Sequence, residues 1–177
     1  MNRRRAMKSL AAAAAAAAVP RPAPAAGGPS ATIYLKRWTT AKKFTIEVVD
    51  AMPAEHFGFK PTPDMRSFGE LMNHLSGANT RYFARIKGAP PPKEPAAADK
   101  ETVKKFMAES FDWCAQILGG LSEDDLAKSY PGATATAVPL SGRDLVLNGF
   151  IHTSHHRGYS EVYLRLKGVP PPRYDVV

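Results

Sequence analysis

The sequence predicts an all-α protein, a four-helix bundle with a crossover connection. Four amphipathic segments of about 20 residues each follow one another, and the alternation of apolar and polar residues that is typical of strands is nearly absent. The connections over residues 88–98 and 119–140 are longer than tight helix–helix turns need, so at least one of them is expected to cross the bundle. A chain of 177 residues with 44% hydrophobic residues suits one such domain.

The first two helices are predicted from stripes of mostly apolar residues at steps of three and four. The first helix ends before Pro53, and its stripe consists of Tyr34, Trp38, Ala41, Thr45 and Val48. The second begins at a capping box formed by Ser67 and Glu70 and ends at Gly88. Its stripe consists of Phe68, Leu71, Leu75, Ala78 and Tyr82.

The last two helices have equally local signals. Asp99 is a candidate N-cap for the third helix, which ends at Gly119 and Gly120, and Ser141 with Asp144 begins the fourth. The third stripe consists of Val103, Phe106, Met107, Ser110, Trp113, Cys114 and Ile117. The fourth runs to Gly168 and consists of Leu145, Gly149, His152, His156, Tyr159 and Tyr163. Between the two helices, residues 129–139 alternate Ala and Thr and favour a short hairpin over one bundle end.

The N-terminus has the layout of a signal peptide. Residues 1–8 are basic, residues 10–19 are an alanine-rich apolar block, and residues 23–25 form a small-x-small cleavage site. The arginines at 3–5 followed by Lys8 resemble a twin-arginine signal, so residues 1–25 predict export to the periplasm, residues 26–31 a linker, and residues 32–177 the mature domain. The alternative is a mis-assigned start or an Ala/Pro tail, which would leave the protein cytoplasmic. The block is too short and alanine-rich for a membrane anchor.

Charge and cysteine content exclude several classes of protein. The net charge is +8, but five of the 24 basic residues lie in the first 25 positions, and the remaining 19 face 16 acidic residues, which leaves +3. No nucleic-acid partner is therefore expected. The single cysteine, Cys114, excludes an internal disulfide and a multi-cysteine zinc site, and its apolar setting predicts a buried residue.

Three histidines are predicted to meet inside the bundle. His152 and His156 lie four residues apart, on one face of the fourth helix. The second and fourth helices end in nearly the same sequence, at Gly88 and Gly168, so both helices are expected to have the same kind of C-terminal end. Counted back from these glycines, His74 lies 14 residues before the end of its helix, level with the midpoint of the pair. Three imidazoles that leave coordination positions open are typical of a catalytic rather than a structural metal site.

These residues also carry a resemblance to the DinB family of metal-binding four-helix proteins. The matching segments are 67–74, 152–158 and 163–171, and the resemblance extends over nearly the whole mature chain. It implies that His74, His152 and His156 are ligands of a divalent ion of the zinc or nickel type, and that homodimers are frequent. Thr153 stands where an acidic residue is common, and Tyr159 where glutamine is common. These two departures adjoin the site and bear on the residues around the ion.

Neighbouring residues have competing interpretations. His155 lies about 100° around the helix from His156 and is expected to be structural or to support a ligand, and His56 is expected at the surface. Glu70 is on the face of His74, although the capping box already occupies it. Asn148 is placed to reach the site as a polar neighbour. Arg157 is expected to contact a substrate or acidic partner, or to be solvated or paired.

Two functions remain open from the sequence. The first is a metal-dependent enzyme acting on an unidentified small molecule, because the resemblance implies relatives that are proposed hydrolases or thiol-dependent transferases. The second is a metal-binding bundle without catalysis, such as a sensor, store or interaction module. A pocket that reaches the histidines from solvent, with a polar lining, is expected only for the first.

Overall fold

The computed structural model describes residues 30–132, 134 and 137–174. The signal peptide predicted over residues 1–25 lies outside them, as does the linker up to residue 29. The four predicted helices are all present, and their bounds are α1 Ala31–Ala51, α2 Phe68–Lys87, α3 Lys100–Gly119 and α5 Gly142–Leu166. The remaining elements are η1 Ala54–His56, α4 Glu123–Ala127, β1 Ser129–Tyr130 and β2 Leu140–Ser141. None of the described helices combines the length and apolar character needed to cross a membrane.

The helix ends follow the local signals in the sequence. At Ser67, the predicted capping box, and at Ser141, the predicted start of the fourth helix, the serine side chain accepts from the backbone N–H of the third helical residue, and the acidic side chain of that residue accepts from the backbone N–H of the serine. Asp99 caps α3 through the backbone N–H of Thr102. Gly88 follows α2 with φ 68°, a conformation that favours glycine. The ends of these helices are therefore encoded locally.

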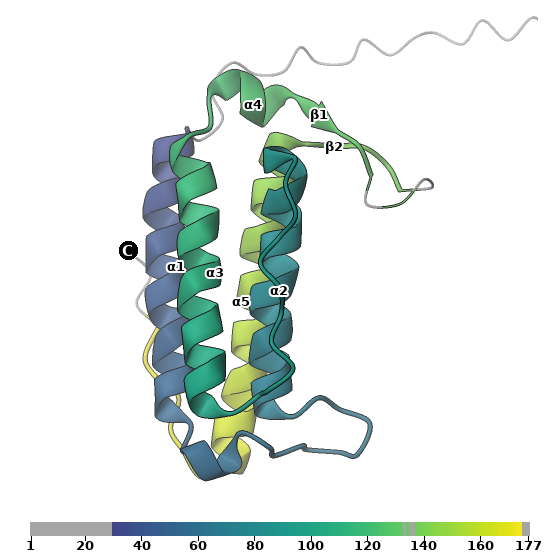
Figure 1. Cartoon of the computed structure of the whole chain (residues 1–177). Helices are drawn as coiled ribbons and strands as arrows, with labels where there is room; N and C mark the ends of the chain where they lie inside the picture. Colours follow the sequence, from purple (N-terminus) through teal and green to yellow (C-terminus); the bar gives the residue numbers. More distant parts are fainter. Residues whose placement is uncertain (1–29, 133, 135–136, 175–177) are drawn as a thin grey trace, which may run out of the picture.

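The bundle contains the predicted crossover. α1 and α5 run in one direction, α2 and α3 in the other, and a long segment returns from the end of α2 to the start of α3 (Figure 1). This crossover, residues 88–99, lies along α2, where the Asn73 side-chain amide donates to the Ala97 carbonyl over 2.9 Å. A Cβ at Gly69 would lie 2.0 Å from the Ala98 carbonyl oxygen. Only glycine allows this close approach, because the atom in the way is backbone.

Trp38 lies at the centre of the core and joins all four long helices. Its side chain is fully buried, and its indole N–H donates to the Phe111 carbonyl of α3 over 3.0 Å. Its rings lie 5.0 Å from Phe83 of α2, 4.9 Å from Phe111 and 5.2 Å from Phe150 of α5, measured between centroids. Aromatic contacts of this kind add to the burial of apolar area. Cys114 is also buried in this core, as predicted.

The connection between α3 and α5 differs from the expectation in one respect. The short hairpin is present as an antiparallel pairing of Tyr130 with Leu140 and of Ser129 with Ser141, although residues 133, 135 and 136 of its loop are outside the described part of the chain. The helix α4 before it was not predicted. It has a capping box of its own at Ser122, but five residues are too few for an apolar stripe to be recognised.

Candidate metal centre

The three histidines predicted as ligands lie together between α2 and α5. His74 projects from the middle of α2, and His152 and His156 project from α5, one turn apart. One nitrogen from each ring can be chosen so that all three atoms lie within 4.8 Å of one another. The ring centroids are 4.3 to 5.4 Å apart. Because α2 and α5 are antiparallel, equal distances from the two C-terminal glycines do not by themselves bring the rings to one level. The three rings meet because the histidines lie in the middle parts of both helices.

The three imidazoles are held in the neutral form. Burial lowers the pKa of His152 to about 3, and the neighbouring His156 and His74 add to the effect. Burial also lowers the pKa of His156 to about 4, with His74 next in importance. The pKa of His74 is lowered by burial and then by Arg66 and Arg81. Neutral imidazoles with free lone pairs are the form that binds a metal ion.

A buried hydrogen-bond chain fixes which nitrogen of His152 carries its proton. The Thr153 hydroxyl donates to the Gly149 carbonyl over 2.8 Å, so the same oxygen must accept from the Asn79 side-chain NH2, which lies 2.7 Å away. This turns the Asn79 amide oxygen towards Nδ1 of His152, at 3.1 Å. An amide oxygen only accepts, so the proton is on Nδ1 and the lone pair is on Nε2.

The sequence predicts only part of this hydrogen-bond network. The sequence indicates Thr153 as a departure from the family pattern and Asn148 as a polar neighbour of the site. It does not indicate Asn79, the residue that contacts His152 in the structure. Asn79 and Thr153 are each 1% exposed, so the network is shielded from water. An imidazole whose second nitrogen donates to a fixed oxygen is the usual arrangement for a metal ligand.

The donor set fits a divalent metal ion. Three neutral imidazoles from two helices supply nitrogen donors that suit such ions and leave coordination positions open. Nδ1 of His156 is buried and has no hydrogen-bond partner among the described residues, an arrangement that buried polar atoms rarely adopt without a ligand. The trio contains no carboxylate, so the protein's own ligands would not offset the charge of the ion.

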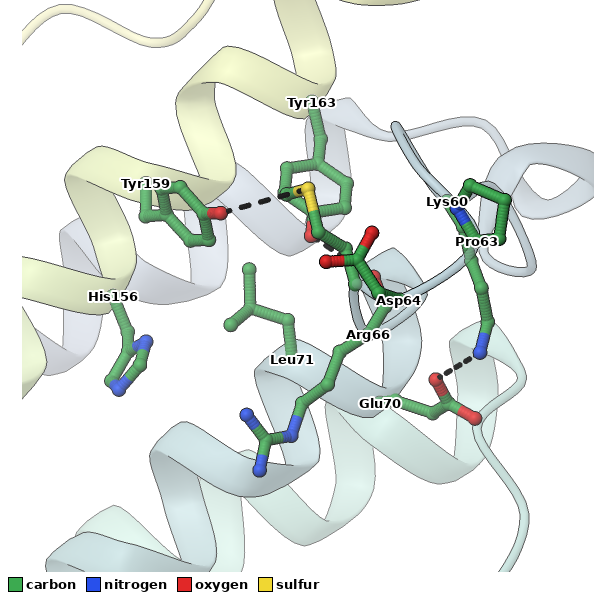
Figure 2. Close-up of a pocket in the computed structure, with 10 residues that line it drawn as sticks. Lys60, Pro63, Asp64, Arg66, Glu70, Leu71, His156, Tyr159 and Tyr163 are labelled. Atoms are coloured by element: carbon green, nitrogen blue, oxygen red, sulfur yellow. Dashed lines mark hydrogen bonds and ion pairs between the residues drawn. The ribbon is translucent and has the colours of Figure 1, made fainter.

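A pocket of about 520 Å³ reaches the trio at His156 (Figure 2). The segment between η1 and α2 forms one wall, and Tyr159 and Tyr163 of α5 form another. The Tyr163 hydroxyl donates to the Arg66 carbonyl over 2.9 Å, which ties the loop to α5. The lining combines charged, aromatic and apolar side chains and consists of Lys60, Pro63, Asp64, Met65, Arg66, Glu70, Leu71, His156, Tyr159 and Tyr163. A volume of this size accommodates a small organic molecule.

The structure shows which of the residues near the three histidines are placed to act on them. Glu70 is engaged by the capping box, where its carboxylate accepts from the Ser67 N–H over 2.7 Å, and it also pairs with Lys60 over 3.2 Å. It is therefore not placed to orient His74. His155 is exposed and is not part of the trio, although its ring centroid lies 4.8 Å from that of His156. His56, expected at the surface, ends η1 and is half-buried.

Arg157 differs from every expectation for it. It is 7% exposed, and its guanidinium lies 4.4 Å from the centroid of the Tyr174 ring. A planar guanidinium against an aromatic face is a stable packing arrangement. Arg157 is therefore neither solvated nor directed into the pocket, and it ties the segment after α5 to the bundle.

The fold and the site together define a helical bundle in which three histidines of two antiparallel helices form a cluster that a pocket reaches at His156. The chain belongs to the DinB superfamily, whose sequence profile matches residues 37–160, more than half of its length. It is 25% identical over 130 residues to the uncharacterized protein YjoA of Bacillus subtilis, which corresponds to 72% of this chain and 84% of that protein.

Solved structures agree with this assignment at the level of the fold. The crystal structure of the DinB-like protein YjoA from Bacillus subtilis superposes with a TM-score of 0.69 at 22% identity and covers 82% of this chain and 99% of its own. A DinB-like protein from Bacillus cereus gives a TM-score of 0.68 at 18% identity and covers 80% and 95%. The predicted family and the predicted helical bundle are thus both confirmed.

Proposed function

We propose that this protein binds one divalent metal ion, of the zinc or nickel type, through His74, His152 and His156, and uses it in a reaction on a small molecule. The observation that carries the proposal is the pocket of about 520 Å³ that reaches His156 from the loop before α2. A purely structural metal site has no need of a pocket, because its ligands close the coordination sphere. Here three ligands would leave coordination positions open, and the pocket would give a substrate access to the ion at His156.

The residues of the site would have separate tasks in such a reaction. The three histidines would hold the ion, which when bound polarises a substrate oxygen or thiol or lowers the pKa of a bound water. Asn79 holds the His152 ring through Nδ1, so that Nε2 faces the site. Tyr159, 41% exposed, and the loop before α2 would contact the body of the substrate.

A second candidate is a bundle that binds the ion without catalysing a reaction. The engagement of Glu70 by Ser67 and Lys60 favours it, because this leaves the carboxylate on the face of His74 without the freedom to act as a general base. A transferase that uses an ion-activated thiol needs no such base, so we place this candidate second. A hydrolase would require the ion itself to activate water.

Metal analysis of the purified protein tests the proposal. We expect about one divalent ion per chain in the wild type and a large loss in His152→Ala. The matched control is His155→Ala, which removes an exposed imidazole next to the trio and should retain the ion. Equal metal content in all three proteins would show that the trio is not the site. A screen of hydrolytic and thiol-transfer substrates on the loaded protein then distinguishes the two candidates.

A further inference from the structure

The charged side chains around the pocket differ in whether they have a partner. Lys60 pairs with Glu70 over 3.2 Å, and Glu70 also accepts from the Ser67 N–H. Asp64 accepts from the Thr62 hydroxyl over 2.5 Å, which lowers the pKa of its carboxyl group. The guanidinium of Arg66 has no hydrogen bond or ion pair to any described residue. It is the one charged group of this lining whose side chain is left for a ligand.

The backbone of Arg66 is fixed although its head group is free. Its carbonyl accepts from the hydroxyl of Tyr163, a residue that is 1% exposed, over 2.9 Å. The next residue, Ser67, is the N-cap of α2 and is held by the capping box. The side chain therefore starts from a fixed point in the pocket wall, so only its rotamers, and not the backbone, must be ordered when the guanidinium binds.

Arg66 faces the same end of the pocket as the histidine trio. In Figure 2 its guanidinium extends to the side on which His156 lies. Its positive charge also contributes to the lowered pKa of His74 and of His156, as expected of a cation within electrostatic range of both rings. Leu71 lies between Arg66 and His156 and presents an apolar wall.

The charge balance of the site calls for an anion. The three ligands are neutral, and the acidic groups of the pocket already have partners, so a bound dication and Arg66 would leave several positive charges uncompensated. Guanidinium groups form bidentate, charge-assisted hydrogen bonds with carboxylates. A ligand with negative charge at one end and a metal-binding group at the other satisfies both positive centres.

We propose that Arg66 binds a carboxylate of the ligand, so that the pocket takes a small organic acid whose second donor group reaches the three histidines. This inference rests on the proposed function for the second contact only. The contact with Arg66 is made by the protein itself and can be measured with or without the ion. The body of the acid would lie against Leu71 and Tyr159.

Calorimetric titration of the full chain tests this with malonate, succinate and glutarate, and with butyrate as the matched monocarboxylate. We expect at least one dicarboxylate to bind the zinc-loaded wild type about ten-fold more tightly than it binds Arg66→Met, which keeps the apolar stem. Arg66→Lys should recover part of the loss. The control Lys60→Met removes a pocket cation that is already paired and should change the affinity less than about two-fold.

Three results bear on the proposal in different ways. Equal dicarboxylate affinities in the wild type and Arg66→Met would overturn it, as would a stronger dependence on Arg66 for inorganic phosphate than for any dicarboxylate. If the wild type binds neither zinc nor nickel, the proposed function fails. The same titrations on the metal-free protein then decide whether Arg66 binds a carboxylate, because butyrate affinity should still fall in Arg66→Met.

Discussion

Replacing Thr153 with valine should weaken metal binding without touching a ligand. The substitution keeps the shape of the side chain and removes the hydroxyl that accepts from Asn79 over 2.7 Å and donates to Gly149 over 2.8 Å. The Asn79 amide is 1% exposed, so its NH2 group cannot turn to water for a replacement partner. A buried donor without a partner costs about 1 to 3 kcal/mol, and the free energy of unfolding should fall by that amount.

The amide has one way to recover a hydrogen bond, and this changes His152. If the Asn79 side chain flips, its NH2 group faces Nδ1 of His152, which must then be the acceptor. The proton moves to Nε2, and the lone pair that faces the site is lost. Loss of such a supporting contact typically lowers metal affinity by about 10- to 100-fold.

The assay is a zinc titration against a chromophoric chelator, combined with ¹⁵N NMR of the His152 ring in the metal-free protein. The control is Thr153→Ser, which loses a methyl group but keeps the hydroxyl, and should retain both the affinity and the Nδ1–H tautomer. Wild-type zinc affinity in Thr153→Val, together with an unchanged tautomer, would refute the hydrogen-bond argument. A loss of stability alone, equal in both variants, would also refute it.

Two further predictions follow from the site and from the sequence. The metal-free protein should lose unfolding free energy between pH 7 and pH 5, because unfolded histidines with a pKa near 6.5 take up protons there, while His152, with a pKa of about 3, and His156, with a pKa of about 4, stay mostly neutral in the fold. Two fully buried histidines would account for about 4 kcal/mol, and the partial exposure of both rings reduces the expected loss to about 1 to 3 kcal/mol. This contribution to stability is thus present above the unfolded pKa and is lost as the pH falls. Denaturant titrations should show that the unfolding free energy of His152→Ala/His156→Ala depends less on pH than that of the wild type. An equal pH dependence in both proteins would contradict the assignment of the loss to these two histidines. For the N-terminus, replacing Arg3, Arg4 and Arg5 with lysine should retain the precursor in the cytoplasm on fractionation, and undiminished export of this variant would argue against a twin-arginine signal.

The sequence is sufficient to predict the four long helices because the signals that begin and end them are local. The capping serines Ser67 and Ser141 and the left-handed Gly88 act within a few residues of themselves, so the helix ends can be identified without knowledge of the fold. The height of the histidines follows from the same signals. His74 and the pair on α5 meet because all three histidines lie in the middle parts of two helices that pack antiparallel.

What the sequence does not reveal depends on contacts between distant segments. Asn79 and Thr153 are 74 residues apart, and no spacing rule connects an amide on α2 with a hydroxyl on α5. The free guanidinium of Arg66 is equally hidden, because it depends on Lys60 and Asp64 finding other partners. The stacking of Arg157 on Tyr174 depends on the course of the chain after α5. Each of these is decided by packing after the helices have formed.

The crossover along α2 has a consequence for how the protein folds. Since α2 and α3 are parallel, they cannot form as a simple hairpin, and the segment over residues 88–99 must span the length of α2 for α3 to pack beside it. The long connections delay the non-local contacts, so we expect slower folding than in a bundle of successive antiparallel hairpins. The site is completed only when α5 docks on α2. An ion held by all three histidines would therefore bind the folded chain alone and lengthen its lifetime once folded.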